Sequence, residues 1–370
     1  MKKGLTLILI GAMLCLCGCS WMDGSYVSVT PHVVTPSQAL DASVQIENYS
    51  QLRNALTDLV DSGSTHSVFP LPAYPQDQID TDMYKAIHYI QNNYPIGAYA
   101  VESIEFEYGS DGAQNVLSVD ITYSHTKAQI DSIRTVRGIA GAKTAIASAL
   151  RACSNSLMLQ VTNYEDTDFA QLVADYSALH PQIVMENPQV ACQIYPDSGD
   201  VRVVELVFTY QTSRESLRTM QNQVTPVFSS AQLYISSDAA SQVKYSQLYT
   251  FLTERFDYTI ETSITPSYSL LCHGVGDSRA FAQVYAAMCH QVELECMVVS
   301  GTRDGESHFW NIVNIDGTYY HLDLLRSFQE GGYTHKADDQ MQGYVWDYSA
   351  YPVCGENTDE TSLPTEFAEG

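Results

Sequence analysis

A helix followed by two alternating strands occurs twice in the first half of the chain, and this repeat constrains the fold most. The first copy reads "TDMYKAIHYIQNNYP", "AVESIEFEY" and "NVLSVDITYS", and the second reads "TDFAQLVADYSALHP", "QVACQIYP" and "VRVVELVFTYQ". Apolar residues alternate with polar ones at Leu117, Val119 and Ile121, and again at Val204 and Leu206, which predicts strands with one buried face. We therefore predict two tandem helix/β-hairpin modules of the α+β class, each with a sheet covered on one side.

Each copy is preceded by an apolar helix and followed by a polar segment, "TKAQIDSIRTV" or "SRESLRTMQNQV", that we also predict to be helical. The modules contain no cluster of histidine, cysteine or carboxylate side chains at catalytic or ligand spacing, so we interpret them as structural or partner-binding spacers. The predicted division of the chain is 1–18 signal peptide, 19–45 tether, 46–140 first module, 141–237 second module, 238–354 third domain and 355–370 acidic tail.

The N-terminus has the pattern of a secretory signal. Lys2 and Lys3 precede an apolar run from Leu5 to Leu16, which is shorter than the ~20 residues that a membrane-spanning helix needs. The "LCGC" that ends this run resembles a bacterial lipobox, which implies cleavage before Cys19 and attachment of a diacylglyceryl group to its sulfur. We expect an extracytoplasmic protein held at the bacterial cell membrane by lipidated Cys19, with an ordinary cleaved signal as the alternative.

The charge of the chain argues against one class of partner. Lysine and arginine total 18 and aspartate and glutamate total 43, which gives a formal net charge of -25. Such a chain repels phosphate backbones, so we expect no nucleic-acid partner.

Six cysteines follow Cys19, and an even number in an exported protein permits disulfides. Cys289 and Cys296 lie in apolar surroundings and are interpreted as core residues, whereas Cys272 and Cys354 form the one suggested disulfide. No close CxxC pair indicates a metal site, and we predict neither a metal nor a cofactor. The two remaining cysteines are Cys153 and Cys192.

The pattern changes in the back half, where "GVGDSRAFAQVYAAMC" has apolar residues at helical spacing. Gly276 and Asp277 supply a loop exit and a helix cap, so Ser278 falls in the first turn. Unsatisfied N–H groups at a helix start favour a developing anion, which makes this a suitable place for a nucleophile. His308 begins the predicted strand "HFWNIVNID" and Asp323 lies in the next, "TYYHLDLL", so an antiparallel hairpin can bring imidazole and carboxylate side by side.

A helix-start nucleophile, a strand histidine and a next-strand aspartate, in this order, resemble the transglutaminase-like domain of the papain-like superfamily. The resemblance covers residues 239–354 and is carried by "HFWNIV", "TYYHLD" and the closing "GYVWDYSAYPVC". The family's helix usually opens with a C-x-G-aromatic-A pattern, onto which Ser278 to Ala282 fall. Ser278 thus occupies the cysteine position, Ala280 replaces the glycine, and Asp323 lacks the Pro-Thr that often follows it.

The serine decides between two functions. A papain-like site stores a thiolate because a thiol pKa of ~8.5 can be lowered below neutrality, but a serine hydroxyl must lose its proton during attack. We therefore expect a non-catalytic, degenerate groove that binds a peptide-like or cell-wall ligand or an envelope partner. The alternative is an amide hydrolase or acyl transferase with Ser278 as nucleophile, His308 as general base and Asp323 as its orienting group.

Other interpretations remain open for single residues. Ser278 can be a plain helix N-cap, and His308 can be a buried structural histidine beside Trp310. Cys272 in "LCHGVG" is an alternative nucleophile. A last alternative, without matching ligand spacing, is a zinc site built from histidines and nearby cysteines. Its histidines would be His273, His290, His308 and His321.

Overall fold

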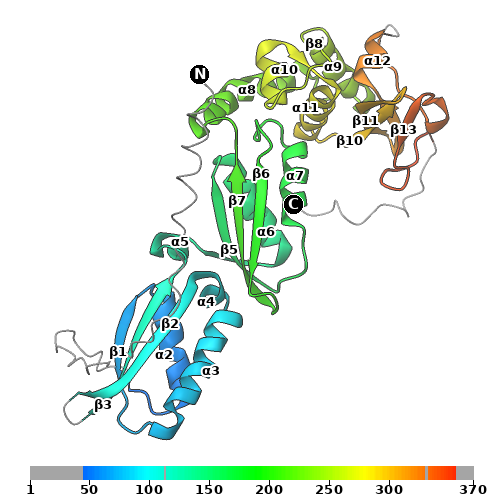
Figure 1. The fold of residues 1–370 in the computed structure, drawn as a ribbon. Coiled ribbons are helices and arrows are strands. Elements are labelled where there is room, and N and C mark those ends of the chain that lie inside the picture. The colour runs from blue at the N-terminus through cyan, green and yellow to red at the C-terminus, as the bar shows by residue number, and fades with distance from the viewer. Residues whose placement is uncertain (1–44, 112–113, 330–331, 356–370) are drawn as a thin grey trace, which may run out of the picture. The chain divides into compact units, whose positions relative to one another are not determined.

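The computed structural model describes residues 45–111, 114–329 and 332–355. The predicted signal peptide, most of the tether including Cys19, and nearly all of the acidic tail lie outside these residues. The chain is a mixture of helices and mainly antiparallel sheets, which confirms the predicted α+β class (Figure 1). Among the described helices, none combines the length and apolar character that crossing a bilayer requires.

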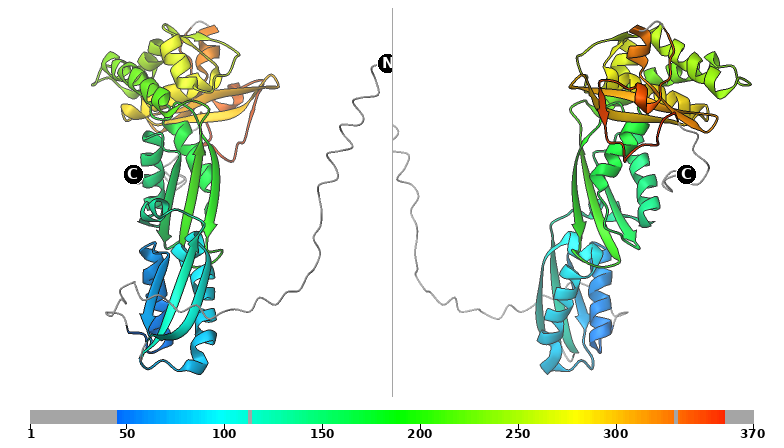
Figure 2. Two further views of the ribbon diagram at one scale, coloured as in Figure 1. Left: turned by 60° about the vertical axis from the view of Figure 1, so that its left-hand side comes forward. Right: turned by 90° about the vertical axis from the view of Figure 1, so that its right-hand side faces the viewer.

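The first module contains a three-stranded antiparallel sheet in the order β1-β3-β2. Apolar residues of α2 and α3, such as Leu56 and Met83, pack against alternate strand residues such as Leu117 and Val119. Figure 2 shows these helices on one side of the sheet, in blue and cyan. The elements are α2 (Tyr49–Asp61), β1 (His66–Pro70), η1 (Gln76–Gln78), α3 (Ile79–Asn92), α4 (Pro95–Ala100), β2 (Val101–Asp111) and β3 (Gln114–Tyr123).

The second module repeats this connectivity, because a helix, a strand, a helix and a hairpin again give the strand order β5-β7-β6. It differs by one additional strand, β4, which pairs in parallel with β5. Apolar residues of α6 and α7, such as Ile146 and Val173, cover the sheet. The elements are α5 (Lys127–Asp131), β4 (Arg134–Arg137), α6 (Gly138–Arg151), β5 (Ser156–Thr162), α7 (Phe169–Leu179), β6 (Gln189–Tyr195) and β7 (Val201–Thr209).

The segment after the first hairpin corrects one helix prediction. The helix begins at a capping box formed by Thr126 and Gln129, but it ends at Asp131. The next residues form β4, where Thr135 donates a hydrogen bond to Gln160 on the neighbouring strand. Pairing with the open edge of β5 therefore outweighs the weak helical pattern, and the second sheet begins before residue 141, where the sequence places the second module.

The third part of the chain packs helices against a sheet of order β12-β11-β10-β13. The predicted polar helix is α8, which is capped by Ser213 and extends from Arg214 to Tyr234. Its residues Leu217, Val224 and Phe228 belong to the same apolar cluster as residues of α9 and α11. That helix thus contributes to the back-half core. The elements are α8 (Arg214–Tyr234), α9 (Ser241–Thr253), β8 (Asp257–Tyr258), α10 (Pro266–His273), β9 (Val275–Gly276), α11 (Ser278–Gln291), β10 (Cys296–Arg303), β11 (Glu306–Ile315), β12 (Thr318–Leu322), α12 (Leu324–Gln329), η2 (Asp338–Gln340) and β13 (Tyr344–Trp346).

Helix α11 is the central element of this part. Ten consecutive residues, from Ala280 to Cys289, are buried, and all except Gln283 have small or largely apolar side chains. Its neighbours are tied by hydrogen bonds of buried tyrosines, since the Tyr285 hydroxyl donates to the Tyr245 carbonyl and the Tyr245 hydroxyl to the Glu295 carbonyl. These bonds connect α11 to α9, and α9 to the residue that precedes β10.

The cysteines separate into core and surface positions. Cys289 and Cys296 are buried in the apolar cluster around α11, as predicted. The suggested disulfide between Cys272 and Cys354 is wrong, because both thiols are free. Cys272 is exposed on α10, whereas Cys354 is buried beside the aromatic residues of the β-sheet.

Gly301 is required where β13 approaches β10. A Cβ atom at Gly301 would lie 2.3 Å from the Val345 carbonyl oxygen and 2.8 Å from the Trp310 ring. We expect Gly301→Ala to lower the free energy of unfolding by about 1–3 kcal/mol, the usual cost of overpacking. Urea unfolding followed by tryptophan fluorescence measures this, because Trp310 and Trp346 both lie in this sheet.

The matched control is Ser300→Ala, which changes an exposed neighbour on the same strand without adding a Cβ atom. We expect it to stay within about 0.5 kcal/mol of the wild type. Equal stability of Gly301→Ala and Ser300→Ala would show that β13 does not approach this closely.

Candidate active site

The first functional side chain lies at the start of α11. Asp277 is the N-cap residue, since its carboxylate accepts a hydrogen bond from the Ala280 N–H at 2.8 Å. Ser278 is therefore the first helical residue, as predicted, and the interpretation of Ser278 as an N-cap is wrong. Its side chain is buried at the end of the helix, where the first N–H groups have no intrahelical acceptor.

Two neighbouring strands bring the other two predicted residues together. β11 and β12 pair in antiparallel register, with Asn311 opposite Leu322, and this places His308 near Asp323. The His308 Nε2 atom lies 2.7 Å from Asp323 Oδ2, and both side chains are buried. A carboxylate accepts but does not donate, so Nε2 carries the proton and Nδ1 is the basic nitrogen of the neutral ring.

Asp323 has more partners than the sequence suggests. Its Oδ2 atom also accepts a hydrogen bond from the Tyr344 hydroxyl at 2.6 Å and lies 3.7 Å from Arg303 Nη1. Its Oδ1 atom accepts from the N–H groups of Leu325 at 3.0 Å and Arg326 at 3.3 Å.

These contacts set the ionisation of Asp323. Burial raises its pKa, but the hydrogen bond and charge of His308, the Tyr344 hydroxyl and the Arg326 N–H together outweigh burial, so the pKa lies below its ordinary value. Asp323 is therefore ionised in the folded protein at neutral pH. The stability that this group contributes is present above the ordinary aspartate pKa and is lost as the pH falls through the lowered one.

Ser278 is near the pair but does not complete a triad in this structure. Its Oγ atom accepts a hydrogen bond from the Phe309 N–H at 3.3 Å. In the described part of the chain, His308 bonds to Asp323 and Ser278 bonds to Phe309, and no hydrogen bond joins Ser278 to His308. The oriented imidazole is thus present, but the contact that would make it a base for Ser278 is not formed.

Tyr344 and Arg303 are neighbours of Asp323 that the sequence pattern does not indicate. Tyr344 lies in the closing "GYVWDY" segment, which carried part of the resemblance without a stated role. Tyr344 belongs to β13 and Arg303 to β10, and the two residues face each other in register. Only the pairing of these strands shows that both reach Asp323.

The alternative nucleophile Cys272 is placed unfavourably. It is the next-to-last residue of α10, where the helix dipole disfavours a thiolate. Although the residue is exposed, partial desolvation raises the pKa of its thiol. These features are opposite to those of an activated cysteine.

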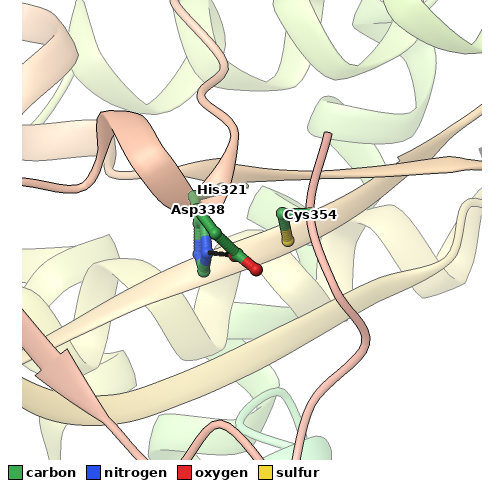
Figure 3. Close-up of side chains that lie close together, drawn as sticks. All are labelled: His321, Asp338 and Cys354. Carbon is green, nitrogen blue, oxygen red and sulfur yellow. Dashed lines mark hydrogen bonds and ion pairs between the residues drawn. The ribbon is translucent and has the colours of Figure 1, made fainter. Parts of the chain in front are cut away.

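The four histidines of the zinc alternative do not form one site. His290 contacts the Cys296 carbonyl, His308 contacts Asp323, and His321 contacts Asp338. The one His/Cys/Asp group in the described part of the chain is instead His321, Asp338 and Cys354, whose ligand atoms lie within 4.8 Å of one another (Figure 3).

The hydrogen bonds of this group oppose metal binding. The Trp310 Nε1–H donates to His321 Nδ1 at 3.0 Å, so Nδ1 is unprotonated and Nε2 donates its proton to Asp338 at 2.8 Å. A metal on Nε2 would leave no proton on the ring, whereas a metal-bound histidine normally donates from its other nitrogen. Burial, followed by Asp338, raises the pKa of the Cys354 thiol, so it remains protonated. We interpret this group as a structural hydrogen-bond network.

Cavities do not identify the site. One cavity of about 340 Å³ is lined by residues of α5, β4, α6, β5 and the turns between them, and another of about 660 Å³ mainly by residues of α3. Neither lining includes Ser278, His308 or Asp323, which are 8%, 7% and 7% exposed. The candidate site is therefore identified by the hydrogen bonds and charge of its side chains, and not by a cavity.

Comparison with solved structures gives distant similarities. A structure of a TGase is 10% identical over 58% of this chain and 66% of its own, with a TM-score of 0.27. A candidate protease from Parabacteroides distasonis is 9% identical over 60% of this chain and 36% of its own, with a TM-score of 0.22. A candidate cysteine protease from Cytophaga hutchinsonii is 12% identical over 42% of this chain and 70% of its own, with a TM-score of 0.23. The sequence matches no curated protein.

A family model gives the assignment. The transglutaminase-like superfamily model matches residues 231–324, a range that contains all of α9, α10, α11, β10, β11 and β12. Ser278, His308 and Asp323 lie inside this range, and Tyr344 lies beyond it. This part of the chain is therefore a transglutaminase-like domain, with a serine at the first position of its central helix.

Proposed function

We propose that this is a lipid-anchored extracytoplasmic protein whose transglutaminase-like domain binds a peptide-like or cell-wall ligand, or an envelope partner, without turning it over. One observation carries this proposal. Ser278 Oγ accepts a hydrogen bond from the Phe309 N–H, and it makes none to His308. A serine nucleophile also needs its own proton to point at the base, and this contact with His308 is not formed here.

The chemistry of serine supports the same conclusion. A thiol at this helix start could be stored as a thiolate beside an imidazolium, but a hydroxyl is far too weak an acid to be stored as an anion. Oxygen is also smaller than sulfur, and the Cβ–O bond is shorter than a Cβ–S bond. The serine oxygen therefore does not extend as far from the backbone as a cysteine sulfur would. A misplacement of an ångström can reduce the rate about a hundredfold.

The second candidate is an amide hydrolase or acyl transferase, and the His308–Asp323 hydrogen bond of 2.7 Å favours it. In that reaction Ser278 Oγ would rotate from Phe309 toward His308 Nδ1, pass its proton there and bond to the acyl carbon. The leaving amine would take the proton, and water or an acceptor amine would release the acyl group. The buried, ionised Asp323 would stabilise the imidazolium that forms.

We expect the folded wild-type protein to show no reaction of Ser278 with a fluorophosphonate probe, because the hydroxyl has no base to activate it. Labelled sites are identified by mass spectrometry, with an active serine hydrolase as the positive control. Labelling of Ser278 that disappears in His308→Ala would replace the binding proposal by the second candidate.

Ligand binding should not depend on the hydroxyl. We expect the soluble protein from Ser20 onward to sediment with purified peptidoglycan, and Ser278→Ala to sediment equally. Ser278→Trp, which puts a bulky ring at the helix start, should reduce the bound fraction about tenfold or more. Absence of sedimentation by the wild type would contradict a cell-wall ligand and leave a peptide or protein partner, and equal binding by Ser278→Trp would place the ligand elsewhere.

The anchor makes a separate prediction. Cys19→Ala should move the protein from the membrane fraction to the soluble fraction, because lipidation of Cys19 is the proposed attachment. The matched control is Cys17→Ala, which removes the other cysteine of "LCGC" and should leave the protein in the membrane fraction. Metabolic labelling with a fatty acid should give signal in the wild type and none in Cys19→Ala.

A further inference from the structure

Tyr344 contacts the site from outside the part of the chain that matches the family. It is the first residue of β13 and is buried, and its hydroxyl lies 2.6 Å from Asp323 Oδ2. Burial, and then the charge of Asp323, raise the pKa of this hydroxyl, so it is protonated. Since Asp323 is ionised, Tyr344 is the donor in this hydrogen bond.

The Tyr344 hydroxyl completes the coordination of Asp323. An ionised carboxylate has about four lone-pair positions. His308 Nε2 and the Tyr344 hydroxyl bond to Oδ2, and the Leu325 and Arg326 N–H groups bond to Oδ1, so all four positions have a donor. A carboxylate held in this way cannot rotate without breaking a hydrogen bond in a buried place.

Strand pairing and a backbone hydrogen bond hold the segment around Tyr344 in place. β13 pairs with β10, and Arg303 lies opposite Tyr344. Gly301 leaves room for the β13 backbone, and the Gly343 carbonyl accepts a hydrogen bond from the Asp304 N–H at 2.8 Å. The position of the hydroxyl is therefore set by strand pairing on the far edge of the sheet.

We infer that Tyr344 is a positioning residue of this site, whose hydroxyl fixes the Asp323 carboxylate so that His308 is held in one tautomer and one orientation. Nδ1 is then the basic nitrogen presented to whatever occupies the site. This inference rests on the proposed function only in taking His308 and Asp323 as the working pair. It holds equally for a binding site and for a serine-dependent enzyme.

A merely structural role for Tyr344 makes a different prediction. Its ring packs edge-on against Trp310, with centroids 5.1 Å apart, and this contact needs no hydroxyl. Tyr344→Phe keeps the ring and removes the donor. Tyr319→Phe is the matched control, because Tyr319 is buried in the same aromatic cluster and its hydroxyl donates to Glu295, away from His308.

The first measurement is the ring ¹⁵N spectrum of His308 in the full-length protein at about pH 9, where an imidazole is neutral. We expect a single Nε2–H tautomer in the wild type and in Tyr319→Phe. In Tyr344→Phe we expect both ring nitrogens to move toward the shifts of a tautomer mixture. An unchanged tautomer in Tyr344→Phe, or an equal change in Tyr319→Phe, would overturn the inference.

The second measurement uses a thiol as a reporter of His308. In a Ser278→Cys background, the introduced thiol should react with iodoacetamide faster than the exposed Cys272, which serves as an internal reference. Adding Tyr344→Phe should slow this reaction about tenfold, the low end of the effect measured for the hydrogen-bond partners of metal-binding histidines. Adding Tyr319→Phe should leave the rate unchanged, and equal rates in the two double variants would contradict the inference.

These readouts are independent of the proposed function, because neither needs a ligand or turnover. Should Tyr344→Phe fail to fold, both measurements are made on Gly301→Ala, which displaces β13 and the hydroxyl with it. That variant should then show the mixed tautomer and the slow thiol, whereas a wild-type tautomer in it would overturn the inference.

Discussion

The buried carboxylate of Asp323 is the group on which the arrangement of the site depends. It joins β12, β11, β13 and the start of α12, since it bonds to His308, Tyr344 and two backbone N–H groups. A buried charge is tolerated only when it is paired and hydrogen-bonded, and loss of one partner leaves a costly unsatisfied acceptor. The buried charge of Asp323 therefore connects four elements of the fold to one another and fixes the ring of His308.

The serine at the start of α11 changes what this fixed pair can do. The family resemblance implies a cysteine at this position, where a helix start and an oriented imidazole lower a thiol pKa. A serine gains little from the same environment, because its proton is lost only during reaction. In the structure, Ser278 Oγ accepts a hydrogen bond from the Phe309 N–H, so it serves as a hydrogen-bond acceptor for a backbone group of β11. In the proposed function, the oriented pair of His308 and Asp323 is present without a nucleophile that it activates.

Local sequence patterns predicted many of the helices and strands. Alternation at Leu117, Val119 and Ile121 predicted a strand with one face in a core, and all three residues are buried in the first module. The signals around Gly276 and Asp277 predicted the start of α11, and Ser278 is its first residue. The errors occurred where a distant partner decides the outcome. Residues 134–137 form a strand because the edge of β5 is open beside them. Cys272 and Cys354 stay apart although both are available thiols.

The sequence by itself determined the candidates Ser278, His308 and Asp323, because their residue types and the elements that carry them are local properties of the chain. Only the tertiary structure decided how they are connected. Strand pairing brings Tyr344 and Arg303, which lie on either side of Asp323 in the sequence, to the same carboxylate. Packing also places the Phe309 N–H, rather than His308, against Ser278. Hydrogen bonds between distant segments depend on distances of a few tenths of an ångström, and no periodicity along a chain specifies them.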